Sequence, residues 1–404
     1  MKTVAIIAEY NPFHNGHKYQ IDKIIEHFGP DTAIVAVMSG NYTQRGELAF
    51  MEKWERARAA VESSVNLVLE LPFPYSMSSA EFFARAAVHI INSLGCIDAI
   101  SFGSECGDIK ELKEAAQRML ADAYKAELSN LISDRKNERL GYAKLCEMAY
   151  SNIYGIAPPS PTANNILALE YIKAAISLNS NLEMHTVKRS GAGYNEEKIT
   201  PSHHQSATAI RKHILNKEFS AEDFIPKSSY NIILDEINSK RAPVDENKLE
   251  LAILANLRLN SPDAECDVHD ADGGLYNRLV RLSHEVNSLS AIKELASTKK
   301  YTDARIRRAI WFSYFGVTSS DVRELPEYTQ ILAMDTVGQA ILKKARKTSK
   351  ISVLNKPSGT PSTDAAKHQK ELSDKADGVY QLAKPAPMPS SSIYKRGPYV
   401  EKDR

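Results

Sequence analysis

Short apolar runs alternate with amphipathic segments through the first half of the chain. Each run is apolar on both faces, as in strands that are covered on both sides of a sheet. The runs lie at 3–8, 32–38, 67–71, 97–102 and 183–187. Segments with helical periodicity separate them, at 17–28, 53–63, 80–94 and 164–178. This βαβ spacing predicts an α/β domain over residues 1–210, with a Rossmann-like parallel sheet wrapped by helices.

From about residue 211 onward the strand pattern fades and helical periodicity predominates. The predicted helices lie at 229–238, 247–257, 274–286, 291–299, 303–315 and 327–347. Residues 351–354 have the pattern of a late strand, and residues 357–363 that of a loop. We therefore expect a mainly α-helical second domain over residues 211–404.

Composition narrows the class of protein. The 404 residues are 43% hydrophobic and 25% charged, which is ordinary for a soluble globular protein. No apolar run approaches the ~18 residues of a transmembrane helix, so no membrane partner is expected. The four cysteines have no CxxC spacing, which argues against a zinc cluster and a disulfide framework. The expected location is a reducing cytoplasm.

The formal net charge of +1 hides an asymmetry along the chain. Residues 339–404 contain 14 Lys and Arg against 6 Asp and Glu, a balance of +8 that leaves −7 for the preceding residues. A basic C-terminal region on a mildly acidic body favours a polyanionic partner. The alternative is a solvated, lysine-rich surface.

The segment between the first predicted strand and the first predicted helix has the features of a phosphate site. It reads EYNPFHNGH over residues 9–17, and ligands of open α/β sheets bind beyond the carboxyl ends of the strands. Gly16 lets the backbone approach a ligand, and the helix N-terminus offers N–H groups. His14 and His17 can stabilise charge that develops on phosphate oxygens. An HxxH spacing without nearby Cys or Asp does not predict a metal site.

These residues carry a family resemblance. His14-Asn15-Gly16-His17 resembles the HxGH motif of HIGH-type nucleotidyltransferases, which cleave ATP between the α- and β-phosphates and transfer AMP. The wider run 7–20, together with 39–54, 70–73 and 80–88, closely resembles the bacterial tRNA(Met) cytidine acetate ligases. A second superfamily signature near ISSTxIR is represented by residues 206–211, which depart from it in their early residues.

The resemblance implies a nucleotide site that contains His14 and His17 as catalytic residues. The implied ATP contacts are Ile7, Ala8, Glu9, Tyr10, Asn11, Pro12, Phe13, His14, Asn15, Gly16, His17, Lys18, Tyr19, Gln20, Gly103, Asn164 and Arg189. Asn165 is the alternative to Asn164 as the ATP contact at this position. Superfamily analogy adds Ser206, Thr208 and Arg211 as contacts to the β- and γ-phosphates. Mg²⁺ is expected to accompany ATP.

Other predicted strand ends supply further candidates. Gly40, Asn41 and Arg45 follow the second strand and are candidate substrate contacts, although Arg45 can equally be a surface residue. Glu105 and Asp108 follow the fourth strand, where we favour a helix-capping role over a metal-binding one.

Two basic segments are candidates for tRNA contacts. Lys299, Lys300, Arg305 and Arg308 lie in and before a predicted helix, with Tyr301 available to stack on a base. Lys343 and Lys344 lie near the end of a helix, where cations also suit the helix dipole. A solvated basic face is the alternative for both segments.

The resemblance implies an ATP-dependent ligase that activates acetate as acetyl-adenylate. The acetyl group would pass to N4 of the wobble cytidine of elongator tRNA(Met), giving N4-acetylcytidine. Two alternatives stay open: a small-molecule adenylyltransferase of the same superfamily, and a non-catalytic tRNA-binding module. No protein partner is evident.

Overall fold

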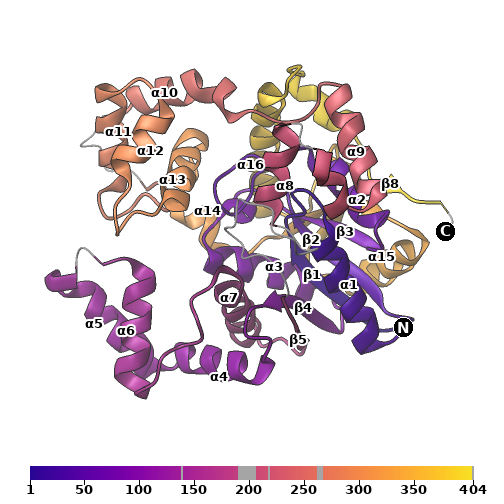
Figure 1. Ribbon diagram of the computed structural model, residues 1–404, viewed down its shortest axis with the longest axis horizontal. Helices are drawn as coiled ribbons and strands as arrows, with labels where there is room; N and C mark the ends of the chain where they lie inside the picture. The colour runs from indigo at the N-terminus through magenta and orange to yellow at the C-terminus, as the bar shows by residue number, and fades with distance from the viewer. Residues whose placement is uncertain (138–139, 190–205, 217–218, 262–266, 403–404) are drawn as a thin grey trace.

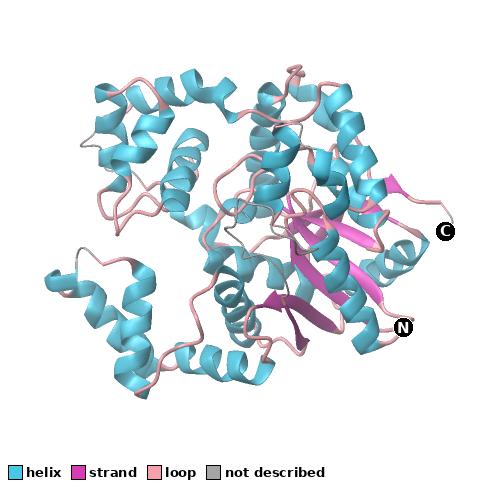
Figure 2. Ribbon diagram, viewed as in Figure 1, coloured by secondary structure: helices cyan, strands magenta, loops and turns pink. Residues whose placement is uncertain are grey.

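A central sheet of eight strands forms the body of the protein (Figures 1 and 2). The computed structural model describes residues 1–137, 140–189, 206–216, 219–261 and 267–402. The strands are β1 (Thr3–Ala8), β2 (Ala33–Ser39), β3 (Leu67–Leu71), β4 (Ala99–Ser104), β5 (Glu183–Lys188), β6 (Tyr328–Met334), β7 (Ser352–Leu354) and β8 (Tyr399–Val400). Their order is β5-β4-β1-β2-β3-β6-β7, with β8 beside β6. The first five strands are mutually parallel, which confirms the predicted α/β class.

Helices cover both faces of the sheet because its central strands are apolar on both sides. One face packs against α1 (Asn15–Phe28), α2 (Lys53–Val61) and α9 (Lys227–Asn238). The other packs against α3 (Ala80–Leu94), α4 (Ile109–Leu120), α7 (Ala163–Ser177) and α15 (Thr336–Thr348). In β2 every residue is buried, and alternate residues enter opposite core clusters. Among the described residues, no helix combines the length and apolarity needed to cross a membrane.

The C-terminal part of the chain completes the sheet. The predicted helix at 327–347 was wrong in its first turns, because Tyr328–Met334 forms β6, antiparallel to β3. Apart from Thr329 and Gln330 this run is apolar, and it is buried on both faces, as a covered strand is. Asp335 then caps α15, since its Oδ1 accepts a hydrogen bond from Gly338 N at 2.8 Å. The predicted division at residue 210/211 therefore does not separate the sheet from the rest of the chain.

Two helical lobes extend from this body on the left of Figure 1. The upper lobe packs around Trp311 and contains α10 (Glu250–Arg258), α11 (Leu275–Glu285), α12 (Leu289–Ala296), α13 (Asp303–Phe315) and α14 (Ser319–Arg323). The lower lobe is a hairpin of α5 (Asp122–Ser133) and α6 (Tyr142–Tyr154), which was not predicted. The lobes meet where Gly141 faces the carbonyl of Lys299, which a Cβ on that glycine would approach to 2.7 Å.

Two further helices complete the described fold. Helix α8 (Ala207–Leu215) lies beside the loop that follows β1, and α16 (Asp364–Tyr380) runs along the ends of β2 and β3. The α16 position is fixed by hydrogen bonds from Tyr380 Oη to the carbonyl of Ala49 and from Ser373 Oγ to the carbonyl of Phe73. Segments 300 or more residues apart in sequence are thereby packed together.

Candidate active site

A pocket opens at the carboxyl ends of β1 and β4. It extends from the N-terminus of α7, past the loop that begins α1, to Gln44 in the loop after β2. Predicted ATP contacts that line it are Ile7, Ala8, Glu9, Tyr10, Asn11, His14, His17, Gln20, Gly103, Asn164 and Arg189. Ser206 lines it as well. The residues predicted to contact a nucleotide from their place after the first strand thus gather around a cavity at the carboxyl edge of the sheet, and their contact with ATP stays a prediction.

Six residues of the 7–20 run do not line this pocket: Pro12, Phe13, Asn15, Gly16, Lys18 and Tyr19. Phe13 is buried in the core below the loop, and Lys18 forms a salt bridge with Asp22 along α1. Asn15 donates a hydrogen bond to the carbonyl of Asp223. Phe13, Asn15 and Lys18 therefore support the loop and the helix instead of facing the cavity.

The two histidines of the motif form the N-terminal cap of α1. His14 Nδ1 accepts a hydrogen bond from Gly16 N at 3.0 Å, and His17 Nδ1 accepts one from His14 N at 3.2 Å. The rings stack with their centroids 3.7 Å apart. A Cβ at Gly16 would lie 2.9 Å from His14 Cε1, so only glycine leaves room for the ring.

These contacts determine the chemistry of the imidazoles. Because both Nδ1 atoms accept backbone hydrogen bonds, the proton of each neutral ring is on Nε2. Burial lowers the pKa of His17 well below its usual value, and the neighbouring His14 and Arg189 lower it further. The pair is therefore a source of neutral N–H donors at the helix N-terminus, a position that favours anions.

The β4 side of the pocket combines a glycine, an amide and a cation. Arg189 Nη1 donates to Asn164 Oδ1 at 3.2 Å, and Asn164 Nδ2 donates to Glu105 Oε1 at 2.6 Å. A Cβ at Gly103 would lie 3.2 Å from Arg189 Cγ, so the glycine makes space for this arginine. Burial opposes ionisation of Glu105, but hydrogen bonds from Thr162 and Asn164 lower its pKa below the usual value.

Asn165 plays a different part from Asn164. Its Oδ1 accepts hydrogen bonds from the backbone N–H groups of Glu105 and Cys106, and its side chain is almost fully buried. Asp108 caps α4, as we favoured, and Glu105 Oε2 accepts a hydrogen bond from the first turn of α7 at Asn165 N. Of the two asparagines, Asn164 is the one that lines the pocket.

The 206–211 segment closes another side of the site. Ser206 is the N-cap of α8, and its Oγ accepts a hydrogen bond from Ala209 N at 3.1 Å. Arg211 Nη1 donates to the carbonyl of Asn11 at 2.8 Å, and its Nη2 contacts Thr208 Oγ1 at 3.4 Å. Arg211 therefore ties α8 to the loop that carries the histidines.

Comparisons with known proteins agree with this geometry. The model of the HIGH Nucleotidyl Transferase family matches residues 1–393. A tRNA(Met) cytidine acetate ligase of Caldicellulosiruptor bescii is 37% identical over 366 residues, which is 88% of each chain. One from Acetivibrio thermocellus is 34% identical over 372 residues, again 88% of each chain. This chain belongs to the tRNA(Met) cytidine acetate ligase family.

Solved structures of this family have the same fold. The apo crystal structure of Thermotoga maritima TmcAL is 30% identical and superposes with a TM-score of 0.92, covering 100% of both chains. The structure of the same protein bound with alpha-thio ATP is 29% identical, with a TM-score of 0.89 and 100% coverage of both chains. This chain therefore shares the fold of these family members over its whole length.

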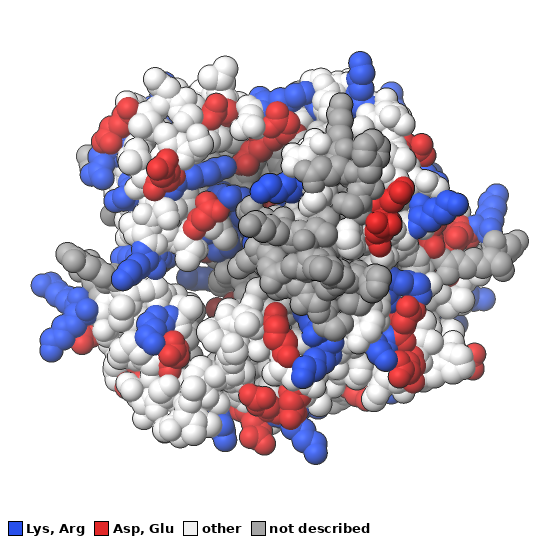
Figure 3. Space-filling model, viewed as in Figure 1, with Lys and Arg blue, Asp and Glu red and all other residues white. Residues whose placement is uncertain are grey.

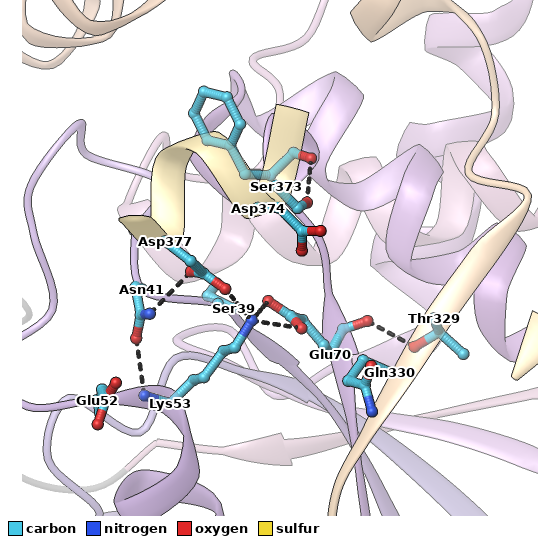
Figure 4. A network of polar contacts seen from close by, with 12 residues as sticks. Ser39, Asn41, Glu52, Lys53, Glu70, Thr329, Gln330, Ser373, Asp374 and Asp377 are labelled. Carbon is cyan, nitrogen blue, oxygen red and sulfur yellow. Dashed lines mark hydrogen bonds and ion pairs between the residues drawn. The ribbon is translucent and has the colours of Figure 1, made fainter. Parts of the chain in front are cut away.

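Two residues predicted to contact substrate instead help to build a buried polar cluster, drawn in Figure 4. Asn41 Nδ2 donates to Asp377 Oδ1, and Asn41 Oδ1 accepts from Lys53 N, both at 2.8 Å. A Cβ at Gly40 would lie 2.5 Å from Glu70 Oε1. Gly40 and Asn41 are thus internal to the ligase fold, while Arg45 lies partly buried in the same loop.

Sequence reasoning missed the centre of this cluster. Lys53 Nζ lies 2.7 Å from Glu70 Oε1 and 2.5 Å from Asp377 Oδ2, and all three side chains are at most 10% exposed. Burial raises the pKa of Glu70 to about 7 and also raises that of Asp377. Burial opposes the charge on Lys53, yet its two carboxylate partners raise its pKa. A glutamate inside the apolar run LVLEL was the available signal.

The predicted RNA contacts divide into buried and exposed groups. Arg305 Nη2 pairs with Asp272 Oδ1 and Arg308 Nε with Asp270 Oδ2, each at 2.5 Å. Because Arg308 is also buried, its prediction as a surface contact was wrong. Tyr301 is buried too and donates to the carbonyl of Gly273, so it does not present its ring for stacking.

Exposed basic residues remain on two separate elements. Lys299 is exposed and Lys300 partly so, at the turn that meets the α5–α6 hairpin. Lys343 and Lys344 are exposed on α15, on the opposite side of the view in Figure 1. On the face shown in Figure 3, basic and acidic side chains are interspersed.

Part of the basic C-terminal charge is neutralised internally. Lys384 and Arg396 each lie 3.0 Å from Glu52 Oε2, at the start of α2. Arg396 also lies 3.4 Å from Glu55 Oε1. The excess charge of residues 339–404 therefore helps to attach the C-terminal segment to the acidic body of the chain.

The expected Mg²⁺ would arrive with ATP, and the described residues offer few ligands of their own. They contain no group of three or more His, Cys, Asp or Glu side chains arranged to hold a metal ion. Glu9 is the one acidic side chain among the described residues that line the pocket. We therefore assign no step of the chemistry to a protein-bound metal.

Proposed function

We propose that this chain ligates acetate to N4 of the wobble cytidine of elongator tRNA(Met), at the expense of ATP. The observation that supports this most strongly is the stacked pair of neutral imidazoles at the N-terminus of α1, inside the pocket. It occurs in a chain 33–37% identical to several tRNA(Met) cytidine acetate ligases over 88–96% of its length.

In the first half-reaction, an oxygen of acetate attacks the α-phosphorus of ATP and pyrophosphate leaves. Acetate is a weak nucleophile, so positioning accounts for much of the acceleration. Negative charge develops on the phosphate oxygens, and the Nε2–H groups of His14 and His17 are placed to donate to them. The guanidinium of Arg189 and the N-terminus of α8 at Ser206 add positive potential.

In the second half-reaction, the cytidine amine attacks the carbonyl carbon of acetyl-adenylate and AMP leaves. The base must leave its stack to reach the pocket, as loop bases do in other RNA complexes. The exposed Lys299 and the partly exposed Lys300 lie at the turn where the two lobes meet, and they are our candidates for contacts with tRNA phosphates.

The function is tested by incubating the full chain with labelled acetate, ATP and bacterial tRNA, without acetyl-CoA. We expect label in tRNA together with one AMP and one pyrophosphate per acetyl group. An elongator tRNA(Met) transcript with uridine at the wobble position is the matched control and should remain unlabelled. ATP turnover only with a small-molecule phosphate acceptor, or tRNA binding without any turnover, would contradict the proposal.

A further inference from the structure

The two ends of the active-site pocket differ in chemistry. On the β4 and α7 side the lining contains Phe102, Gly103, Leu167 and Tyr171, which suit the flat faces of a nucleoside. On the β1 and β2 side it contains the carboxylate of Glu9. Glu9 and the histidine pair both follow β1, the strand that lies between β4 and β2. A carboxylate does not favour the phosphates of ATP, so Glu9 needs another explanation.

Glu9 is held firmly at this place. Its Oε1 accepts a hydrogen bond from Gln44 N at 2.9 Å, which joins the end of β1 to the loop after β2. The fully buried guanidinium of Arg56 donates to the carbonyl of Glu9 at 2.5 Å and to that of Ser39 at 3.1 Å. Both strand ends are thereby fixed, and the carboxylate is preorganised at the edge of the cavity.

Acetyl transfer produces a proton that some group must accept. His14 and His17 are poorly suited, because their Nδ1 atoms accept backbone hydrogen bonds and their Nε2 atoms carry protons. Arg189 is a cation, and Asn164 and Gln44 are amides. Among the described residues of the pocket, this leaves Glu9 as the side chain with the chemistry of a general base.

We propose that Glu9 takes the proton of the cytidine N4 amine during acetyl transfer, an inference that rests on the proposed function. The N4 lone pair forms a bond to the acetyl carbonyl carbon. The bond between that carbon and the phosphate oxygen breaks, and its electron pair leaves on AMP. One N4 proton passes to the Glu9 carboxylate, so no oxidant, reductant or further reactant is needed.

The surroundings of Glu9 support a base of useful strength. Burial raises its pKa above the usual value, and the nearby Glu47 acts in the same direction. The Gln44 N–H group, Arg211 on α8 and Arg56 on α2 act in the opposite direction. A carboxyl group with a raised pKa is a stronger base once it is ionised. Its pKa is also closer to the working pH, where general bases are most efficient.

Glu9→Gln tests this role without removing the side chain. The amide oxygen can still accept the hydrogen bond from Gln44 N, but it cannot take up a proton. Acetate-dependent exchange of labelled pyrophosphate into ATP reports the first half-reaction, and we expect it to fall at least about 10-fold less than transfer does. Single-turnover transfer from preformed, enzyme-bound acetyl-adenylate to tRNA should slow by about 100-fold or more. Glu81→Gln, an exposed change on α3, is the matched control.

The outcomes separate the two proposals. Equal losses in exchange and transfer would mean that Glu9 only supports nucleotide binding, and unchanged transfer would assign the proton to AMP or water; both overturn the inference. Wild-type protein that catalyses neither half-reaction would overturn the proposed function itself. If Glu9→Gln fails to fold, the wild-type pH profile decides: transfer, but not exchange, should rise with pH as a single group ionises. A transfer rate without that rise contradicts the role.

Discussion

The pocket and the buried cluster lie at the same edge of the sheet but handle charge in opposite ways. The pocket follows β1 and β4, whereas the cluster of Lys53, Glu70 and Asp377 follows β2 and β3 (Figure 4). In the cluster a cation from α2 meets carboxylates from β3 and α16. In the pocket the helix N-terminus, two imidazoles and Arg189 outweigh Glu9, the one carboxylate among the lining residues that the structure describes.

This difference identifies which site awaits a ligand. A buried cluster whose charges pair within the chain has little to gain from an outside ion. A cavity lined by donors and a cation gains most when an anion enters. Hydrophobic patterning alone does not separate the two cases, because Gly40-Asn41 and His14-Asn15-Gly16 both follow buried strands.

The largest effect is expected on stability, from breaking the cluster. Lys53→Met removes the cation and leaves two buried carboxylates without it. We expect the free energy of unfolding, measured with denaturant, to fall by about 3–5 kcal/mol. Adding Glu70→Gln and Asp377→Asn should restore a large part of this loss, since no buried charge then lacks a partner. A loss below about 1 kcal/mol for Lys53→Met would show that the cluster is not a closed electrostatic unit.

The next effect is a pH dependence of stability that comes from Glu70. Folding raises its carboxyl pKa from the usual 4.5 to about 7, because burial and the nearby carboxylate of Asp377 raise it more than Lys53 lowers it. The folded state therefore holds this proton more tightly, and its stabilisation is complete below about pH 4.5 and is lost as the pH rises toward 7. The difference is on the order of 3 kcal/mol. The stability of Glu70→Gln, measured by denaturant unfolding at several pH values, should lack this decline. An identical decline would mean that another titrating group causes it.

The sequence revealed one member of this comparison and not the other. The histidine motif spans only four consecutive residues, and its place between a strand and a helix is visible from local patterning. The cluster depends on Asp377, which meets Lys53 only because α16 returns to the sheet 324 residues later. No local pattern reports such a partner.

The same limit explains the other differences between expectation and structure. Tyr328–Met334 is almost entirely buried and includes the polar Thr329 and Gln330, so its pairing with β3 rather than its own periodicity makes it a strand. Arg308 has the sequence context of a basic helical face, but a distant loop supplies Asp270 to neutralise it. Local patterns predicted the β1–β5 framework well because its units are contiguous; contacts across the chain decided the rest.

Removing one imidazole from the pocket should impair catalysis without disturbing the buried cluster of Lys53, Glu70 and Asp377. His14→Ala or His17→Ala deletes a donor to developing phosphate charge and should slow adenylate formation by at least about 100-fold. Acetate-dependent pyrophosphate exchange measures this step. Each variant also loses part of the α1 cap, so its thermal unfolding must be measured in parallel, with a cost of about 1 kcal/mol expected. Wild-type exchange rates in both variants would remove the histidines from the mechanism.

The smallest effect distinguishes the two adjacent asparagines of α7. Asn164→Ala removes hydrogen bonds to Arg189 and Glu105 at the pocket wall, and should weaken ATP binding by about 0.5–1.5 kcal/mol, roughly 2- to 13-fold. Asn165→Ala is the matched control, because it leaves the partly buried N–H groups of Glu105 and Cys106 without their acceptor. It should lower stability by about 1–3 kcal/mol and leave the ATP affinity of the folded protein unchanged. Calorimetric titration and thermal unfolding of both variants measure these effects. The reverse pattern would place Asn165 at the nucleotide and Asn164 in the framework. The wall of the pocket at Asn164 would then resemble the buried cluster, with its polar groups paired within the chain.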